Sequence, residues 1–328
     1  MRAALALLFV AILPGVPGSL AQTRQQLFQQ ISQLDNLVSE GEYGRAAQLA
    51  KLLFERLQIR EHDDQSVLSL AYIGKTQTEI GRLGEAVNAL GMAEALSSRI
   101  GTTYYDATLS REAAALYYAL AGYDEAAASA AKAVRLSQEH NSPRIRTAYC
   151  KSIEALALLR IGKLSEAEIL SLSAVKECPK KTGKYFVYEP RILDTACLVE
   201  SHLGNYADAE AYCRRGLEIA AQSKRETRDL SLGYLALAEA ELEASDLAHS
   251  REAATRSRDL TAKLFGEQHQ DMVQALGLLA KVSAKEGDMA DACAHANRAV
   301  KIATALFGAG SPGVAVPMRA LRQMDACR

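Results

Sequence analysis

The sequence contains no tryptophan, and aromatic residues make up only 6% of its 328 positions. It carries no excess of charge either, with 38 basic against 39 acidic residues and no basic block. Such a chain lacks the electrostatic footprint of a nucleic-acid-binding protein. After residue 21 it also lacks any apolar run near the roughly 20 residues that cross a bilayer. We therefore predict no nucleic-acid partner and no membrane span.

The usual signatures of catalysis and metal binding are missing too. The 6 histidines are scattered singly, without a His-x-x-x-His pair or a Cys-x-x-Cys partner, whereas zinc needs three or four converging ligands. Gly74-Lys75-Thr76 resembles the end of a phosphate-binding loop, but Ser69 replaces the glycine required five residues earlier, and the stretch is expected in mid-helix. The sequence thus predicts no metal, no cofactor and no catalytic residue.

The first residues, by contrast, carry a definite pattern. Arg2 precedes an apolar run over residues 3–12, and small residues end the segment at Ala21. This layout is typical of a secretory signal peptide, and no cysteine follows that would carry a lipid. We predict that residues 1–21 are a leader cleaved after Ala21. The mature protein, residues 22–328, would then be exported to a periplasm or secreted.

An internal repeat fills the rest of the chain. A small residue is followed two positions later by a large apolar one and five positions later usually by alanine, and this pattern occurs seven times at spacings of 40 to 42 residues. Such a period indicates an array of supersecondary units. The small residues, which we take as the turns, are Gly41, Gly81, Ala121, Gly162, Gly204, Ser245 and Gly287.

Two further columns keep the same register. Seven residues before each turn and twelve after it, the chain places mostly small residues, which let two helix axes approach to about 8–10 Å. Between the turns the apolar spacing is helical, as at Leu232, Leu235 and Leu242. We predict an all-α fold, a right-handed superhelix of about seven helical hairpins. The segment 314–328 is expected to add a C-terminal capping helix.

These small, tyrosine or leucine, and alanine positions resemble tetratricopeptide repeats. The period of about 42 residues and the LFG…SP joint are similar to the longer variant found in kinesin light chains and in many bacterial exported proteins. The resemblance covers about residues 24–328, although the large aromatic usual early in the first helix is mostly absent. It implies a stacked array of helix pairs whose first helices line a concave face. The carboxylate clamp of some chaperone-binding members is not matched.

The stretch KLFGEQHQ, residues 263–270, could be a catalytic or metal site or a joint between units. The stretch ALFGAGSP, residues 305–312, repeats it 42 residues later and aligns Ser311 with His269. A recurring segment favours the joint. We expect Gly266 to cap one helix in a left-handed conformation and His269 to lie in the loop or at the start of the next helix.

The 6 cysteines allow disulfides in an exported protein, in 15 possible pairings. Residues that face each other across a helical hairpin have positions centred on its turn. This rule selects three bridges, Cys150–Cys178, Cys197–Cys213 and Cys293–Cys327. The alternative is that helical cysteines are simply small buried apolar residues.

The concave face is expected at positions 13, 10, 6 and 3 before each turn. Its side chains mix apolar and polar groups with charges of both signs, which suits an extended peptide or a partner helix. Tyrosines on it are good interface anchors, although they also fill space between alanine-rich helices. The residues expected to contact a partner are Arg111, Tyr118, Tyr149, Ser152, Arg191, Asp194, Glu239, Gln274 and Lys281.

Because the repeat leaves no room for a catalytic domain, we predict a non-enzymatic exported scaffold that binds a protein or peptide on the concave face. One alternative is a small-molecule-binding or enzymatic groove. It would require a buried pocket that joins titratable groups such as Arg191, Asp194 and Glu239 with strongly shifted pKa values. Another alternative is a purely structural or oligomer-forming subunit. The sequence leaves the partner's identity and the oligomeric state open.

Overall fold

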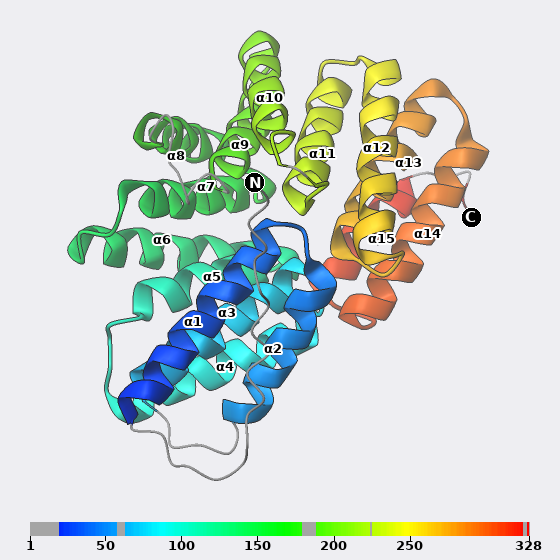
Figure 1. The fold of residues 1–328 in the computed structure, drawn as a ribbon. Coiled ribbons are helices and arrows are strands. Elements are labelled where there is room, and N and C mark those ends of the chain that lie inside the picture. Colours follow the sequence, from blue (N-terminus) through cyan, green and yellow to red (C-terminus); the bar gives the residue numbers. More distant parts are fainter. Residues whose placement is uncertain (1–19, 58–62, 179–187, 224, 324–326, 328) are drawn as a thin grey trace, which may run out of the picture.

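Figure 1 shows the fold in a computed structural model, which describes residues 20–57, 63–178, 188–223, 225–323 and 327. These residues contain fifteen α-helices and no strand. The helices are α1 (Leu20–Ser39), α2 (Tyr43–Leu57), α3 (Asp64–Glu79), α4 (Leu83–Ile100), α5 (Asp106–Ala119), α6 (Tyr123–Glu139), α7 (Arg144–Arg160), α8 (Leu164–Glu177), α9 (Tyr188–His202), α10 (Tyr206–Ala220), α11 (Arg228–Glu243), α12 (Leu247–Phe265), α13 (Gln270–Glu286), α14 (Met289–Phe307) and α15 (Pro312–Gln323).

The helices pair into seven antiparallel hairpins, from α1–α2 to α13–α14, and α15 packs on the last pair (Figure 1). This confirms the predicted superhelix of hairpins with a capping helix. A residue with positive φ lies between the two helices of every hairpin, and these residues are Gly41, Gly81, Ala121, Gly162, Gly204, Ser245 and Gly287. Each lets the chain reverse while its N–H group bonds a carbonyl of the preceding helix, as Gly81 does to Thr78 at 3.3 Å.

Small residues bring the helices of each hairpin together. The column seven residues before the turns is buried throughout, and Ala114 on α5 and Ala155 on α7 are fully inaccessible. The facing column twelve residues after the turns is equally buried, with Ala133 on α6 and Ala174 on α8. Because most of these positions carry no side chain larger than a methyl group, the helix axes approach closely and large side chains pack around them.

The superhelix curls until its two ends touch. The ring of Tyr43, at the start of α2, packs on Phe265, at the end of α12, with centroids 4.7 Å apart. Phe307, at the end of α14, packs against the apolar core of the first two hairpins. An ion pair between Glu42 and Arg225 joins the same two ends. The concave side is therefore the interior of a curled array, and the first helices of the hairpins surround it.

Gly81 is required by this closure as well as by its turn. Its φ of +78° lies in the left-handed region. A Cβ atom at this position would also lie 2.5 Å from Cδ2 of His269, which approaches from the other end of the chain. Any side chain here would therefore strain the turn and separate α3 from α13.

The capping helix starts earlier than predicted. It begins at Pro312 and not at residue 314, so Pro317 lies beyond its first turn. Pro317 has no N–H group to donate to the carbonyl of Gly313 four residues back. Gly313 in turn lies against the ring of Phe307, where no larger residue fits.

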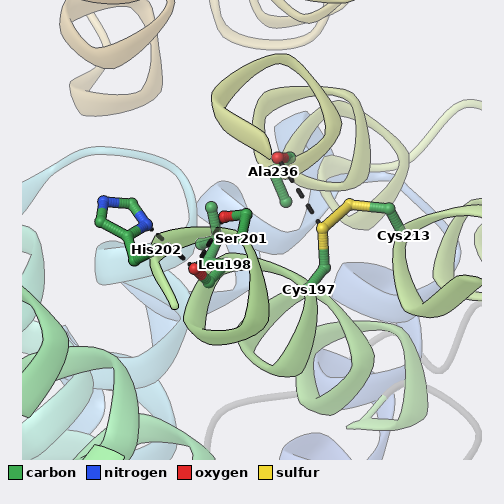
Figure 2. Close-up of a disulfide and its surroundings, with 6 residues drawn as sticks. All are labelled: Cys197, Leu198, Ser201, His202, Cys213 and Ala236. Carbon is green, nitrogen blue, oxygen red and sulfur yellow. Dashed lines mark hydrogen bonds between the residues drawn. A yellow bond between two sulfur atoms is a disulfide. The ribbon is translucent and has the colours of Figure 1, made fainter. Parts of the chain in front are cut away.

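Two of the three predicted disulfides are present. Cys197 of α9 is bonded to Cys213 of α10, next to Ala236 of α11 (Figure 2), and the two Cα atoms are 5.3 Å apart. The second bridge, Cys293–Cys327, ties the segment after α15 to α14 with the same Cα separation of 5.3 Å. Both link elements that face each other across a turn, as the midpoint rule requires.

The third predicted bridge, Cys150–Cys178, is wrong, since both cysteines are free. The two residues belong to one hairpin but face its opposite sides. Cys150 is buried against Ser137 of the preceding hairpin, whereas Cys178 lies near Glu189 at the start of α9. The midpoint rule places residues along a hairpin but takes no account of the direction in which each side chain leaves its helix.

The predicted leader falls almost entirely outside the described residues. Leu20 and Ala21 begin α1, and residues 1–19 are not described, so cleavage after Ala21 stays a prediction. In the described part of the chain, no helix is both long and apolar enough to cross a membrane.

Candidate functional site

A cavity of about 130 Å³ lies in the interior of the superhelix. Its walls come from α3, α5, α7, α9, α11 and α13, which are the first helices of six successive hairpins. The middle of the wall is apolar, and its main contributors are Ala115, Ile153, Leu156, Leu198, Leu232 and Leu235. Charged and polar side chains of the same helices complete the lining.

The cavity collects most of the residues that were expected on the concave face. Seven of the nine line it, namely Tyr118, Tyr149, Ser152, Arg191, Asp194, Glu239 and Gln274. The other two lie elsewhere. Arg111 is 4% exposed and donates from Nε to Glu112 at 2.9 Å. Lys281 is exposed on α13, beyond the cavity wall.

An ion cluster closes one end of the cavity. Glu79, the last residue of α3, accepts from both Nη atoms of Arg191 at 2.7 Å and from Nη1 of Arg228 at 2.8 Å. Arg191 also donates from Nε to Asp229 at 2.7 Å. Arg228 is held by Asp271 in a two-point contact at 2.7 and 2.8 Å. The cluster thus joins hairpins two, five, six and seven through side chains alone.

These groups stay charged although they are buried. Burial by itself would raise the pKa of Glu79, but the guanidinium groups of Arg191 and Arg228 outweigh it and hold the pKa far below its usual range. Burial likewise opposes ionisation of Asp271, and Arg228 lowers its pKa. Paired in this way, the charges are tolerated inside the superhelix, whereas loss of one partner would leave another uncompensated.

A second ion pair lines the cavity wall. Arg160 of α7 makes a two-point contact with Glu239 of α11, with Nη2 to Oε2 at 2.8 Å. Its Nε donates to the hydroxyl of Tyr118 at 3.2 Å. Burial would raise the pKa of Glu239, but Arg160 lowers it to about 2. Like Glu79, this carboxylate is therefore fully ionised and fully engaged.

Asp194 differs from every other carboxylate in the cavity wall. It lies on α9, is 7% exposed, and neither of its oxygens has a hydrogen-bond partner among the described residues. Burial raises its pKa well above the ordinary value, and the charge of Asp229 raises it further, while Arg191 acts in the opposite direction.

A second, larger chamber of about 300 Å³ adjoins the first. Glu79, Tyr149 and Arg191 line both, so the ion cluster is the partition between them. The far side of this chamber is built by α1 and α3, where Phe28 is 59% exposed. Tyr149 stacks on Tyr188 with ring centroids 4.5 Å apart, which fixes one wall.

The charged residues at the helix ends were not among the residues expected on the concave face. Glu79 and Arg160 lie two residues before their turns, one position away from the column assigned to the concave face. Asp229 and Asp271 share another column, sixteen residues before the turns and in the first turn of a helix. An acidic residue is favoured there by the helix dipole, so the column had a local explanation that concealed its partners.

His269 has the structural role expected from the repeated joint. It precedes α13, and its Nδ1 accepts the N–H of Asp271 at 3.2 Å. The ring stacks on Phe265 with centroids 4.2 Å apart, and its Nε2 lies 3.3 Å from the carbonyl oxygen of Glu79. Gly266 has a φ of +79° but an extended ψ, so it ends α12 without the left-handed cap expected there. No group of three or more potential metal ligands converges among the described residues.

No protein-family model matches the chain, and no curated protein sequence is similar to it. Solved structures are similar in fold. NprR in complex with its cognate peptide NprX has a TM-score of 0.61 and 14% identity, covering 92% of this chain and 88% of that one. The apo form of the quorum sensor NprR from B. thuringiensis has a TM-score of 0.54 and 13% identity, covering 93% and 88%. A Rap protein complexed with competence and sporulation factor has a TM-score of 0.52 and 13% identity, covering 92% and 98%.

At such identities the likeness concerns the fold alone. It agrees with the hairpin geometry described above, and the tetratricopeptide-like repeat fold expected from the sequence is confirmed.

Proposed function

We propose that this tetratricopeptide-like superhelix is a non-enzymatic scaffold that binds a peptide segment in its interior. The observation that carries the proposal is the interior cavity, with an apolar middle and charged groups around it, built by the first helices of six hairpins. Binding sites of this composition take apolar groups and orient them with a few polar ones. Two of the similar folds, NprR and the Rap protein, were solved with peptide or factor bound, which supports a binding role for this fold.

The size of the cavity suggests what part of a peptide it takes. A volume of about 130 Å³ is close to that of an engineered protein cavity that binds benzene. One apolar side chain therefore fits between Ile153, Leu156 and Leu235.

The pairing of Glu79 and Glu239 with arginines supports a binding role for these two carboxylates over a catalytic one. A general base or nucleophile must be free to exchange a proton near neutral pH. Glu79 and Glu239 are instead held ionised by arginines, whose donors are occupied in turn. Such groups are suited to rigid walls and to orienting a ligand.

The test is a selection of displayed random heptapeptides on the immobilised protein, followed by calorimetric titration of the enriched sequences. Ala115→Phe places a ring in the cavity, and Ala248→Phe places the same ring on the exposed surface of α12 as a matched control. We expect the selected peptides to bind the parent chain and the Ala248 variant alike. The Ala115 variant should lose at least about tenfold in affinity. Absence of enrichment, or equal binding by all three proteins, would refute the proposal.

Binding of a small molecule is the second candidate. It is favoured because Arg191, Asp194 and Glu239 do meet in one buried cavity with shifted pKa values, as that alternative required. Native mass spectrometry of protein purified from its own source decides between the two. A co-purifying mass of a few hundred daltons that disappears in the Ala115→Phe variant would favour the small molecule.

We also propose that the protein acts outside the reducing cytoplasm. The disulfides Cys197–Cys213 and Cys293–Cys327 support export, because such bonds persist in oxidising compartments. The full-length chain expressed with a C-terminal tag should be recovered outside the cytoplasm with Gln22 as its first residue. Retention of residues 1–21 in the cytoplasmic fraction would count against it.

A further inference from the structure

Asp194 has no salt-bridge partner among the described residues, because the arginine closest to it along α9 is paired with other carboxylates. Arg191 lies one helical turn before it on α9, where opposite charges usually pair. However, Arg191 donates from Nε to Asp229 at 2.7 Å and from both Nη atoms to Glu79, also at 2.7 Å. The guanidinium is therefore held away from Asp194. Burying a carboxyl group that has no hydrogen-bond partner costs free energy of folding, so a functional reason for this residue is expected.

Two glycines let the backbones of α10 and α11 approach this carboxyl closely. A Cβ atom on Gly216 of α10 would lie 2.8 Å from Oδ1 of Asp194, and one on Gly233 of α11 would lie 3.7 Å from the same oxygen. The column of Gly216 holds alanine in several other hairpins, so glycine is not required there for helix packing alone, whereas Gly233 also makes room for Leu217 of α10. The two glycines leave Oδ1 without a side chain against it from α10 or α11.

The charges around the ion cluster are also unequal. Among the described residues, Glu79, Asp229 and Asp271 pair with two guanidinium groups, those of Arg191 and Arg228, and the third arginine of the cavity wall, Arg160, is bound to Glu239. His269 also lies beside Asp271, but burial lowers the pKa of its ring. An ionised Asp194 would add one more negative charge to this excess. A ligand carboxylate is thus disfavoured, whereas a ligand cation would restore the balance.

We infer that Asp194 recognises a protonated primary amine of the ligand, next to the apolar group that fills the cavity. The inference rests on the proposed binding function and names the chemistry of its ligand. Two sources supply such an amine, the N-terminus of a peptide with an apolar first side chain and the side chain of lysine. In either case the ammonium donates to the oxygens of Asp194, which have no partner within the described protein.

Binding of this kind is coupled to pH. In the free protein, burial and the nearby Asp229 keep the pKa of Asp194 high, and Arg191 only partly opposes them. Of the other helices around the carboxyl, α10 places the uncharged Gly216 against it, and α7 contributes Tyr149 to the same cavity. An ammonium favours the ionised form, so the carboxyl proton leaves to solvent when the ligand binds. Affinity for the amine should therefore rise with pH until Asp194 is ionised in the free protein, as proton linkage requires.

Three probes of one shape test the inference: 2-phenylethylamine, 2-phenylethanol and 3-phenylpropionate. Their binding is measured by ligand-observed NMR and calorimetry on the full chain and on Asp194→Asn, which keeps the shape of the side chain. We expect the amine to bind at least tenfold more tightly than the alcohol, and the carboxylate more weakly than both. In Asp194→Asn the preference for the amine should vanish while the alcohol still binds. Glu85→Gln, at an exposed carboxylate of α4, should retain the preference.

A second measurement needs no variant. Titration of the amine in buffers of different ionisation enthalpy should show proton release on binding at the lower end of the range from pH 5 to pH 8, and tighter binding at pH 8 than at pH 5. Three short peptides distinguish the two sources of the amine. Phe-Ala amide carries a free N-terminus, N-acetyl-Phe-Lys amide carries only the lysine amine, and N-acetyl-Phe-Ala amide carries neither.

The outcomes separate the inference from the proposed function. Equal binding of amine and alcohol, an unchanged preference in Asp194→Asn, or no proton release overturns the role of Asp194, and the binding function stands if selected peptides still require the cavity. Failure of every probe to bind overturns the role of Asp194. If no peptide is enriched either, the proposed function falls as well.

Discussion

Glu79 and Arg228 are 149 positions apart in the sequence, yet Nη1 of Arg228 donates to Oε2 of Glu79 at 2.8 Å. One residue ends the first helix of the second hairpin, and the other begins the first helix of the sixth. Together with Arg191, they connect the ends of the superhelix across its interior. This contact turns an open array of hairpins into a closed one and sets the size of the cavity.

Glu79→Gln should weaken this closure. The substitution removes the carboxylate shared by Arg191 and Arg228, although Asp229 and Asp271 still pair with them. We expect a loss of about 3 kcal/mol in the free energy of unfolding, at the low end for removal of one partner from a buried ion pair. Urea denaturation measures it. Glu85→Gln, at an exposed ion pair, should cost less than about 1 kcal/mol. Equal effects of the two substitutions would show that the cluster does not hold the ends together.

Gly81→Ala and Gly162→Ala together distinguish the cost of straining a turn from the cost of disturbing the contact between the two ends of the superhelix. Both glycines have positive φ, +78° and +82°, so each substitution should cost about 1 kcal/mol in backbone strain. Only at Gly81 would the new Cβ meet His269, and nothing lies within 4 Å at Gly162. We expect Gly81→Ala to cost about 1–3 kcal/mol more, as overpacking does. Thermal unfolding of the pair checks this, and indistinguishable midpoints would contradict the contact.

The lowered pKa of Glu239 predicts how the free energy of unfolding depends on pH. Its pKa is about 2 in the folded protein against an ordinary 4.5, because Arg160 outweighs the effect of burial. A lowered pKa means that the stabilisation is present above about pH 4.5 and is lost as the pH falls towards 2. Glu239→Gln should therefore be less stable than the parent by about 3 kcal/mol at pH 7. This difference should shrink steadily between pH 5 and pH 3 in urea titrations. A constant difference would mean that the carboxylate charge contributes nothing.

Alkylation under denaturing, non-reducing conditions should label two of the six cysteines, Cys150 and Cys178. Replacing Cys197 and Cys213 together with serine removes a bridge of sequence separation 16 and should cost about 3 kcal/mol. Cys178→Ser, at a free and half-buried thiol, should leave stability nearly unchanged. Mass spectrometry counts the labelled thiols, and labelling of all six in protein isolated without reductant would refute both bridges.

The columns of the repeat made most of the fold predictable from the sequence. Gly41, Gly162 and Ala121 belong to a periodic pattern that only a turn explains, and the fully buried alanines mark the contacts within each hairpin. Seven of nine expected concave residues line the cavity for the same reason, since position within a helix determines which face a side chain occupies.

The sequence by itself determined what depends on neighbours along the chain: helix, turn, the pairing of adjacent helices, and two disulfides across a turn. Only the tertiary structure decided that Glu79 meets Arg191 and Arg228, that His269 lies against Gly81, and that Asp194 is left without a partner. The physical reason is that the curvature of the array accumulates from small rotations between many hairpins. No single unit encodes where the two ends meet, and those meeting points create the cavity and its charges.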